Sequence, residues 1–164
     1  MWRQVKLAFL LSAVLLVSQN SSAQAIDMTM TDLQGVEHRL SGYKGQWVVV
    51  NYWATWCPPC LEEIPELVQF HEQHKDKDAI VLGINSENIS EQRLMEFLDD
   101  YFVTYPVFPS KPSIQTPFGP LPGLPTTYLI APDGDLVARQ VGGVSAKVIE
   151  EFMQKWKSRK SSKP

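Results

Sequence analysis

The sequence of 164 residues has only two cysteines and three histidines, so few of its side chains can bind a transition metal. A structural zinc site needs four ligands, and two thiolates supply half of them. His71 and His74 follow Cys60 by more than two helical turns and cannot join it unless the helix folds back. The sequence therefore predicts no metal site.

The chain also has no excess of positive charge and no basic patch. Lys and Arg total 15 against 18 Asp and Glu, which gives a formal net charge of −3 at pH 7. Domains that bind nucleic acid carry clustered Lys and Arg, so this composition argues against a nucleic-acid partner. No internal repeat or low-complexity block is present, and the length fits one domain.

A long apolar run is missing as well. The run Leu7–Val17 has 11 residues, whereas a membrane-spanning helix needs about 20. It follows the basic Arg3 and Lys6 and precedes a small, polar stretch that ends in an Ala-x-Ala pattern at Ala25, which is typical of a secretory signal peptide. We expect residues 1–25 to be cleaved off, leaving an exported protein of formal net charge −5. An uncleaved N-terminal anchor is the alternative.

The two cysteines lie in Trp53-Ala54-Thr55-Trp56-Cys57-Pro58-Pro59-Cys60. The apolar run Trp47–Tyr52 before this stretch predicts a buried strand, and the residues after it have apolar side chains at helical spacing. A Cys-x-x-Cys motif between a strand and a helix is typical of thiol redox chemistry. A structural disulfide is the alternative, but a loop this short would constrain the unfolded chain very little.

The position of each cysteine predicts its part in the chemistry. Cys57 is expected at the N-cap of the helix, with Pro58 at the first helical position, where a missing N–H has no cost. The positive end of the helix dipole favours a thiolate at Cys57, so Cys57 should attack. Cys60, one turn later and more buried, should close the disulfide and resolve the intermediate. Because Pro58 and Pro59 offer no N–H donors, the pKa of Cys57 should be only moderately lowered, which favours a reductant over a strong oxidant.

Asn51 to Cys60, followed by Glu63 and Pro65, resembles the extracytoplasmic thioredoxin-like thiol–disulfide oxidoreductases of the TlpA and ResA type. Gly123 to Ile130 resembles the second thioredoxin signature, and the resemblance extends from about Met28 to Trp156. It implies a thioredoxin-like α/β fold, a three-layer sandwich with a central mixed β-sheet and an N-terminal β-hairpin extension.

The hydrophobic pattern supports this fold class, because strands alternate with helices before a hairpin and a final helix. The predicted domain covers residues 26–157, and residues 158–164 are expected to form a disordered basic tail. The predicted strands are 28–31 and 37–40 as a hairpin, 47–53, 79–84, 126–131 and 136–141, and the predicted helices begin at Pro58, after Ser90 and near Val148.

The segment Tyr105–Pro125 holds seven of the twelve prolines and is predicted to be a stiff loop without a helix or a central strand. Phe118 and Leu121 in this loop are candidate contacts for protein partners, although an ordinary surface connection is the alternative. Trp53 is expected in the core.

Glu63 is the candidate acid–base group. Thioredoxins carry at the position of Asn51 a buried aspartate that helps to deprotonate the resolving cysteine, and an amide cannot move that proton. Glu63 lies three residues after Cys60, on the same helix face. A partly desolvated carboxylate there would have a raised pKa suited to this task. In the alternative, Glu62, Glu63 and Glu66 form a solvated acidic face near the helix start.

The resemblance also implies a substrate-binding surface around the cysteines. The bond Leu124–Pro125 is expected to be cis and to face the cysteines, where the backbone before the proline can pair with an extended substrate segment. An ordinary trans turn is the alternative. Trp56, next to the nucleophile, and the two motif prolines, Pro58 and Pro59, complete the predicted set.

The sequence therefore predicts an exported thiol–disulfide oxidoreductase that needs no cofactor and acts as a monomer. The resemblance implies reduction of disulfides in client proteins such as apocytochrome c or metallochaperones. An exported reductant also needs a membrane electron donor to regain its electrons. A disulfide-forming oxidant, a module that binds Cu(I) through Cys57 and Cys60, and a binding protein without redox activity remain the alternatives.

Overall fold

The structure is a computed structural model that describes residues 26–162, so the predicted signal peptide, residues 1–25, lies outside the described residues. The elements in chain order are β1 (Thr29–Thr31), β2 (Glu37–Arg39), the 3-10 helix η1 (Leu40–Tyr43), β3 (Trp47–Trp53), α1 (Pro58–His74), β4 (Ala79–Ser86), α2 (Glu91–Asp100), β5 (Val107–Ser110), β6 (Gln115–Thr116), β7 (Gly119–Pro120), β8 (Thr126–Ile130), β9 (Leu136–Val141) and α3 (Ala146–Ser161).

Five strands form the central sheet, in the order β5-β4-β3-β8-β9. The middle strand, β3, is parallel to β4 on one side and antiparallel to β8 on the other. All seven residues of β3 are buried, as its continuous apolar run predicts for a strand that is covered on both faces. The sheet is therefore mixed, which confirms the predicted α/β architecture.

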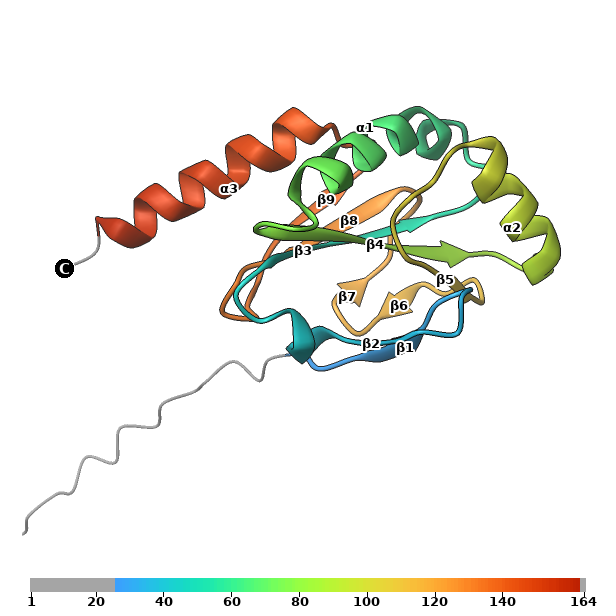
Figure 1. Cartoon of the computed structure of the whole chain (residues 1–164), viewed down its shortest axis with the longest axis horizontal. Coiled ribbons are helices and arrows are strands. Elements are labelled where there is room, and N and C mark those ends of the chain that lie inside the picture. Colours follow the sequence, from blue (N-terminus) through green and yellow to red (C-terminus); the bar gives the residue numbers. More distant parts are fainter. Residues whose placement is uncertain (1–25, 163–164) are drawn as a thin grey trace, which may run out of the picture.

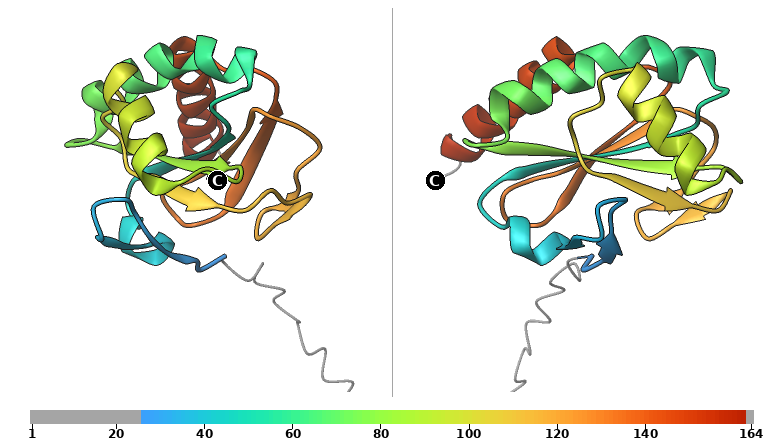
Figure 2. Two further views of the ribbon diagram at one scale, coloured as in Figure 1. Left: turned by 90° about the vertical axis from the view of Figure 1, so that its right-hand side faces the viewer. Right: turned by 45° about the vertical axis from the view of Figure 1, so that its right-hand side comes forward.

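The sheet separates two covering layers, as Figures 1 and 2 show: the three helices lie on one face, and the β1/β2 hairpin, η1 and the β6/β7 hairpin lie on the other. Alternation along β3 supplies both sides of the core. Trp47, Val49 and Trp53 belong to the cluster under the helices. Val48 and Val50 belong to the cluster under the hairpins. The predicted N-terminal hairpin is confirmed, with Thr29–Thr31 paired to Glu37–Arg39.

The proline-rich segment contains more structure than the sequence predicts. It includes β5, which pairs parallel to β4 at the edge of the sheet, and the small β6/β7 hairpin. Pro109 is tolerated in β5 because an edge strand has one side without ladder partners. Phe118 and Leu121 are both buried, and both belong to the core cluster under the hairpins. Both alternatives from the sequence, a partner contact and an ordinary surface connection, placed these side chains at the surface and are therefore wrong for them.

The predicted disordered tail is also wrong as far as Ser161, because α3 continues to that residue. Its final turns pair with the body of the domain through Lys157 and Asp78, 3.1 Å apart, and through Lys160 and Asp133. Cations are favoured in the last turn of a helix because they offset the dipole. The basic composition that suggested disorder here stabilises the end of a helix instead.

Gly83 in β4 faces two aromatic rings that have no room to move. A Cβ at this position would lie 2.8 Å from Cε2 of Tyr105 and 3.2 Å from Nε1 of Trp53. Both rings are almost fully buried. Gly83→Ala should therefore destabilise the protein by about 1–3 kcal/mol, the usual cost of overpacking. Urea unfolding measures this, with Gly42→Ala as the control because a Cβ there meets open space. Equal unfolding midpoints for the two variants would contradict the prediction.

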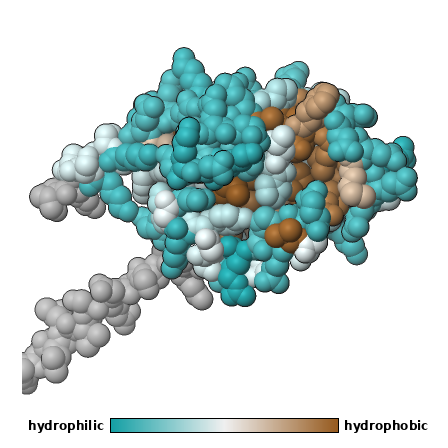
Figure 3. All heavy atoms as spheres, viewed as in Figure 1, coloured by the Kyte–Doolittle hydropathy of each residue, from teal (hydrophilic) through white to brown (hydrophobic). Residues whose placement is uncertain are grey.

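The surface is mostly hydrophilic on the face shown in Figure 3, where apolar side chains gather beside α2. Within residues 26–162, no helix is both long enough and apolar enough to cross a membrane.

Candidate active site

The two cysteines lie where the middle strand meets the first helix. β3 ends at Trp53, a short turn follows, and α1 begins at Pro58 with Cys57 as its N-cap. Cys57 has extended backbone angles, φ −96° and ψ 102°, and the N–H of Cys60 donates to its carbonyl oxygen at 2.9 Å. The two Cα atoms are 5.3 Å apart, and the side chains form a disulfide. Cys57 thus lies beyond the carboxyl end of β3, where open α/β sheets bind their ligands.

Both sulfur-bearing residues are covered in this disulfide form. Cys57 is 3% exposed and Cys60 is fully buried, so Cys60 is the more buried of the two, as the sequence predicts. The neighbours of Cys57 differ sharply from it, because Trp56 is 67% exposed and Pro58 and Pro59 are exposed as well. A reacting thiol must therefore approach Cys57 past a rim formed by these three side chains.

Glu63 is buried below the disulfide-bearing turn of α1, with 3% of its surface exposed. Its Oε1 accepts a hydrogen bond from Nδ2 of Asn51 at 2.8 Å, and its Oε2 accepts one from the backbone N–H of Val144 at 2.9 Å. Burial raises the pKa of Glu63 to about 7, because these two hydrogen bonds, which lower it, only partly offset the loss of water. The alternative of a solvated acidic face is therefore wrong for Glu63, although its neighbour Glu62 is exposed.

Asn51 fixes the position of this carboxyl group. Its Nδ2 also donates to Oγ1 of Thr127 at 3.0 Å, so the amide is held between β8 and α1. Asn51 lies on β3 between Val49 and Trp53. Because side chains alternate along a strand, all three point to the face of the sheet that the helices cover. An amide here orients Glu63 without competing for its proton.

The bond Leu124–Pro125 is cis, as the resemblance predicts. The antiparallel register of β3 and β8 pairs Tyr52 with Thr126. Leu124 and Pro125 directly precede β8, and Leu124 packs against the apolar cluster that includes both cysteines.

Comparison with known proteins agrees with this geometry. Residues 22–139 match the AhpC/TSA family. The chain belongs to this family. It is 32% identical over 132 residues to the thiol-disulfide oxidoreductase ResA of Halalkalibacterium halodurans, in an alignment that covers 80% of this chain and 74% of the relative.

Solved structures give the same result for the fold of this AhpC/TSA protein. A DsbF homologue from Corynebacterium diphtheriae superimposes with a TM-score of 0.70 and 28% identity, covering 79% of this chain and 83% of the other. A secreted thiol-disulfide isomerase from Corynebacterium glutamicum has a TM-score of 0.66 and 27% identity, covering 76% and 80%. This AhpC/TSA chain is therefore a thiol–disulfide oxidoreductase with a thioredoxin-like fold.

Several contacts at the site of this AhpC/TSA protein have no signal in the sequence. Val144 and Thr127, which hold Glu63 and Asn51, lie more than 70 residues away along the chain. Glu87, directly after β4, accepts the backbone N–H of Thr55 at 2.7 Å, two residues before Cys57. Thr127 lies in the segment that resembles the second thioredoxin signature, but Val144 and Glu87 belong to no motif, and only the packing of distant segments brings the three residues to the site.

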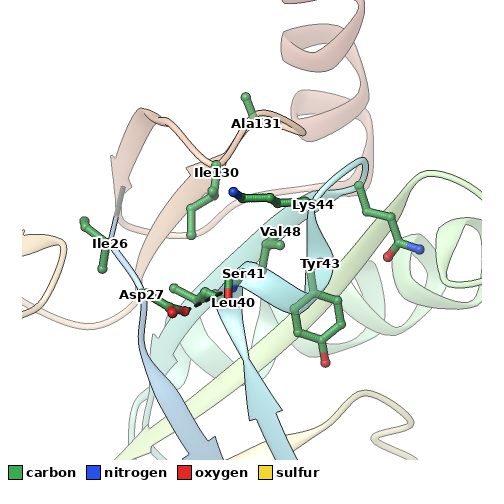
Figure 4. Close-up of a pocket in the computed structure, with 11 residues that line it drawn as sticks. Ile26, Asp27, Leu40, Ser41, Tyr43, Lys44, Val48, Ile130 and Ala131 are labelled. Carbon is green, nitrogen blue, oxygen red and sulfur yellow. Dashed lines mark hydrogen bonds between the residues drawn. The ribbon is translucent and has the colours of Figure 1, made fainter. Parts of the chain in front are cut away.

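A separate apolar pocket of about 170 Å³ lies at the opposite end of the sheet from the disulfide of this AhpC/TSA protein. It is bordered by Val48 at the start of β3 and Ile130 at the end of β8, and Figure 4 shows these side chains with Lys44 and Tyr43 around it. None of the predicted site residues lines this pocket. Among residues 26–162, no three His, Cys, Asp or Glu side chains gather in a way that could hold a metal ion.

Proposed function

We propose that this protein is an exported reductase that delivers electrons from Cys57 and Cys60 to disulfides in client proteins. The observation that carries the proposed direction is the helix start at Cys57. Pro58 and Pro59 occupy the first two helical positions and provide no N–H, and no N–H hydrogen bond caps the Cys57 side chain. A thiolate at Cys57 therefore gains less stabilisation than one that faces free N–H groups, and a less stabilised thiolate makes the reduced form a better electron donor.

The reaction proceeds through a mixed disulfide. In the reduced protein, the Cys57 thiolate attacks one sulfur of a client disulfide, the client S–S bond breaks, and the second client sulfur leaves as a thiolate. Glu63 then accepts the proton of the Cys60 thiol. The Cys60 thiolate attacks the Cys57 sulfur, which restores the Cys57–Cys60 disulfide and releases the first client sulfur as a thiolate. Two electrons pass from protein to client.

The rim around Cys57 supports binding of an extended client segment. Trp56 provides an exposed apolar contact next to the nucleophile. The backbone at Leu124, before the cis bond to Pro125, is the proposed pairing site for the client, because Leu124 packs against the apolar cluster that includes both cysteines. Pro58 and Pro59 complete the surface on the helix side.

Several observations support the proposed export of the protein and its proposed partners. The N-terminal segment has the pattern of a signal peptide, and a structural relative is named as secreted. The proposed clients are proteins of the apocytochrome c or metallochaperone type, as the TlpA and ResA resemblance suggests. A membrane electron donor would reduce Cys57–Cys60 after each cycle, and the protein would act as a monomer without a cofactor.

The reduction potential of the Cys57–Cys60 pair tests the proposed direction. We expect a value near or below about −230 mV, toward the thioredoxin end of the known range. Equilibration with glutathione or dithiothreitol buffers, followed by quantification of the two redox forms, measures it. A value near about −120 mV, that of a strong oxidant, would overturn the reductive proposal. Insulin reduction and anaerobic Cu(I) titration distinguish the reductase from a copper-binding module.

A further inference from the structure

Glu87 links the ends of the two parallel strands beside the disulfide. It follows β4 directly and is half-buried. Its Oε1 accepts hydrogen bonds from the backbone N–H of Thr55 at 2.7 Å and from Nδ2 of Asn85 at 2.7 Å, and its Oε2 accepts one from Oγ1 of Thr55 at 3.1 Å. One carboxylate thus holds both the backbone and the side chain of Thr55, a half-buried residue in the turn that leads from β3 to Cys57.

These contacts fix the turn on which the nucleophile depends. Within the turn, the N–H of Cys57 donates to the carbonyl oxygen of Ala54 at 3.3 Å. The N–H of Thr55, between them, points outward and donates to Glu87. A backbone N–H that loses its acceptor must bond water instead or move to another acceptor. A shift of Thr55 would also move Trp56 and Cys57, which follow it in the turn.

The charge on Glu87 is not neutralised by a partner. None of the ion pairs among residues 26–162 includes Glu87, and its three hydrogen bonds come from neutral donors. On its open side, a groove of about 450 Å³ is also lined by Arg93, Glu96 and Asp100, which together add one positive and two negative charges. With Glu87 itself, three carboxylates and one guanidinium line this groove, so its acidic groups outnumber its basic ones.

We propose that Glu87 is a positioning residue that holds the turn of residues 54–57, and that its negative charge opposes thiolate formation at Cys57 and keeps the pair reducing. This inference rests on the proposed reductase function and names a residue that sets its direction. The relevant equilibrium is the reaction of the protein disulfide with two glutathione thiols, which yields the protein dithiol and one glutathione disulfide. Stabilising the Cys57 thiolate stabilises the dithiol and makes the protein a weaker reductant.

Glu87→Gln separates the charge from the contacts. The glutamine oxygen can still accept from the N–H of Thr55, and the hydroxyl of Thr55 can accept from the new amide, so the turn is kept. We expect the Cys57 pKa, titrated by thiolate absorbance, to fall below that of the unmodified protein. The glutathione equilibrium should shift toward the dithiol by about threefold to tenfold, and tenfold corresponds to about 30 mV for this two-electron couple.

Glu91→Gln is the matched control, because it removes an exposed charge from the first turn of α2 without touching the cysteine turn. It should change the glutathione equilibrium by less than twofold. Glu87→Ala removes both the charge and the contacts. It should also slow the attack of Cys57 on a client disulfide, both at saturating and at subsaturating concentrations of the client. If Glu87→Ala does not fold, Glu87→Gln still decides whether the charge of Glu87 sets the Cys57 pKa and the glutathione equilibrium.

The two proposals fail in distinguishable ways. An unmodified protein that neither reduces insulin nor equilibrates with glutathione would overturn the reductase function. An active unmodified protein whose Glu87→Gln and Glu91→Gln variants share its Cys57 pKa and its glutathione equilibrium would overturn only the effect of the Glu87 charge. A folded Glu87→Ala variant that attacks the client disulfide at the rate of the unmodified protein would overturn the positioning role.

Discussion

Glu63→Gln should slow resolution of the mixed disulfide by about a hundredfold at pH 8, while leaving the first attack by Cys57 nearly unchanged. General acid–base catalysis by a positioned side chain contributes about 10²–10⁴-fold, and an amide at this position cannot take the proton of Cys60. Only the ionised carboxylate can accept the Cys60 proton. The unmodified protein should therefore resolve the mixed disulfide faster as the pH rises through the pKa of Glu63, about 7. The variant should lack the rise that follows the ionisation of Glu63, so its pH dependence should be flatter between about pH 5 and 8.

The surroundings of Glu63 allow this substitution without loss of the fold. A glutamine keeps one oxygen to accept the N–H of Val144. Its amide then faces Asn51, whose own side chain can rotate so that its oxygen accepts, and the Thr127 hydroxyl can donate to that oxygen in turn. The change therefore removes a titrating group and keeps the hydrogen-bond network.

Single-turnover mixing of reduced protein with a disulfide-bearing client resolves the two steps. Acid quenching and mass measurement give the amount of mixed disulfide at each time. Glu62→Gln is the control, because Glu62 is exposed and precedes Glu63 on the same helix. Resolution rates that match the unmodified protein across pH 5–8 would remove Glu63 from the mechanism.

The unit that carries the cysteines could be predicted from sequence because its signals are local. The apolar run of β3, Cys57 before two prolines and the helical spacing of α1 all lie within about 30 residues, and each constrains the backbone directly. The cis bond at Pro125 came from the family resemblance, since nothing in its own dipeptide distinguishes cis from trans.

What could not be predicted depends on contacts between distant segments. Whether Glu63 is solvated or buried is decided by Val144, 81 residues later, which closes over it before α3. Phe118 follows a proline in a stretch with a loop-like composition, and only the β6/β7 hairpin turns its ring into the core. Periodicity reports which side of an element is apolar, but it does not report which other segment covers that side.

Burial of Glu63 should also make the stability of the oxidised protein depend on pH. Its pKa is about 7 in the folded protein against 4.5 for the group in water. Between these values the folded state holds a proton that the unfolded state has released, so the stabilising contribution is complete below about pH 4.5 and is lost as the pH rises through 7. This difference between the two pKa values corresponds to about 3 kcal/mol of unfolding free energy.

Comparison with Glu63→Gln isolates this contribution from all other titrating groups. His71, for example, acts in the opposite direction, because burial lowers its pKa and folding is then favoured as the pH rises toward 6.5. Such groups are the same in both proteins and cancel in the difference. Urea unfolding of the oxidised forms at pH 4 and pH 9 should therefore show the variant gaining about 3 kcal/mol relative to the unmodified protein. A difference that stays constant with pH would mean that Glu63 ionises in the folded protein as it does in water.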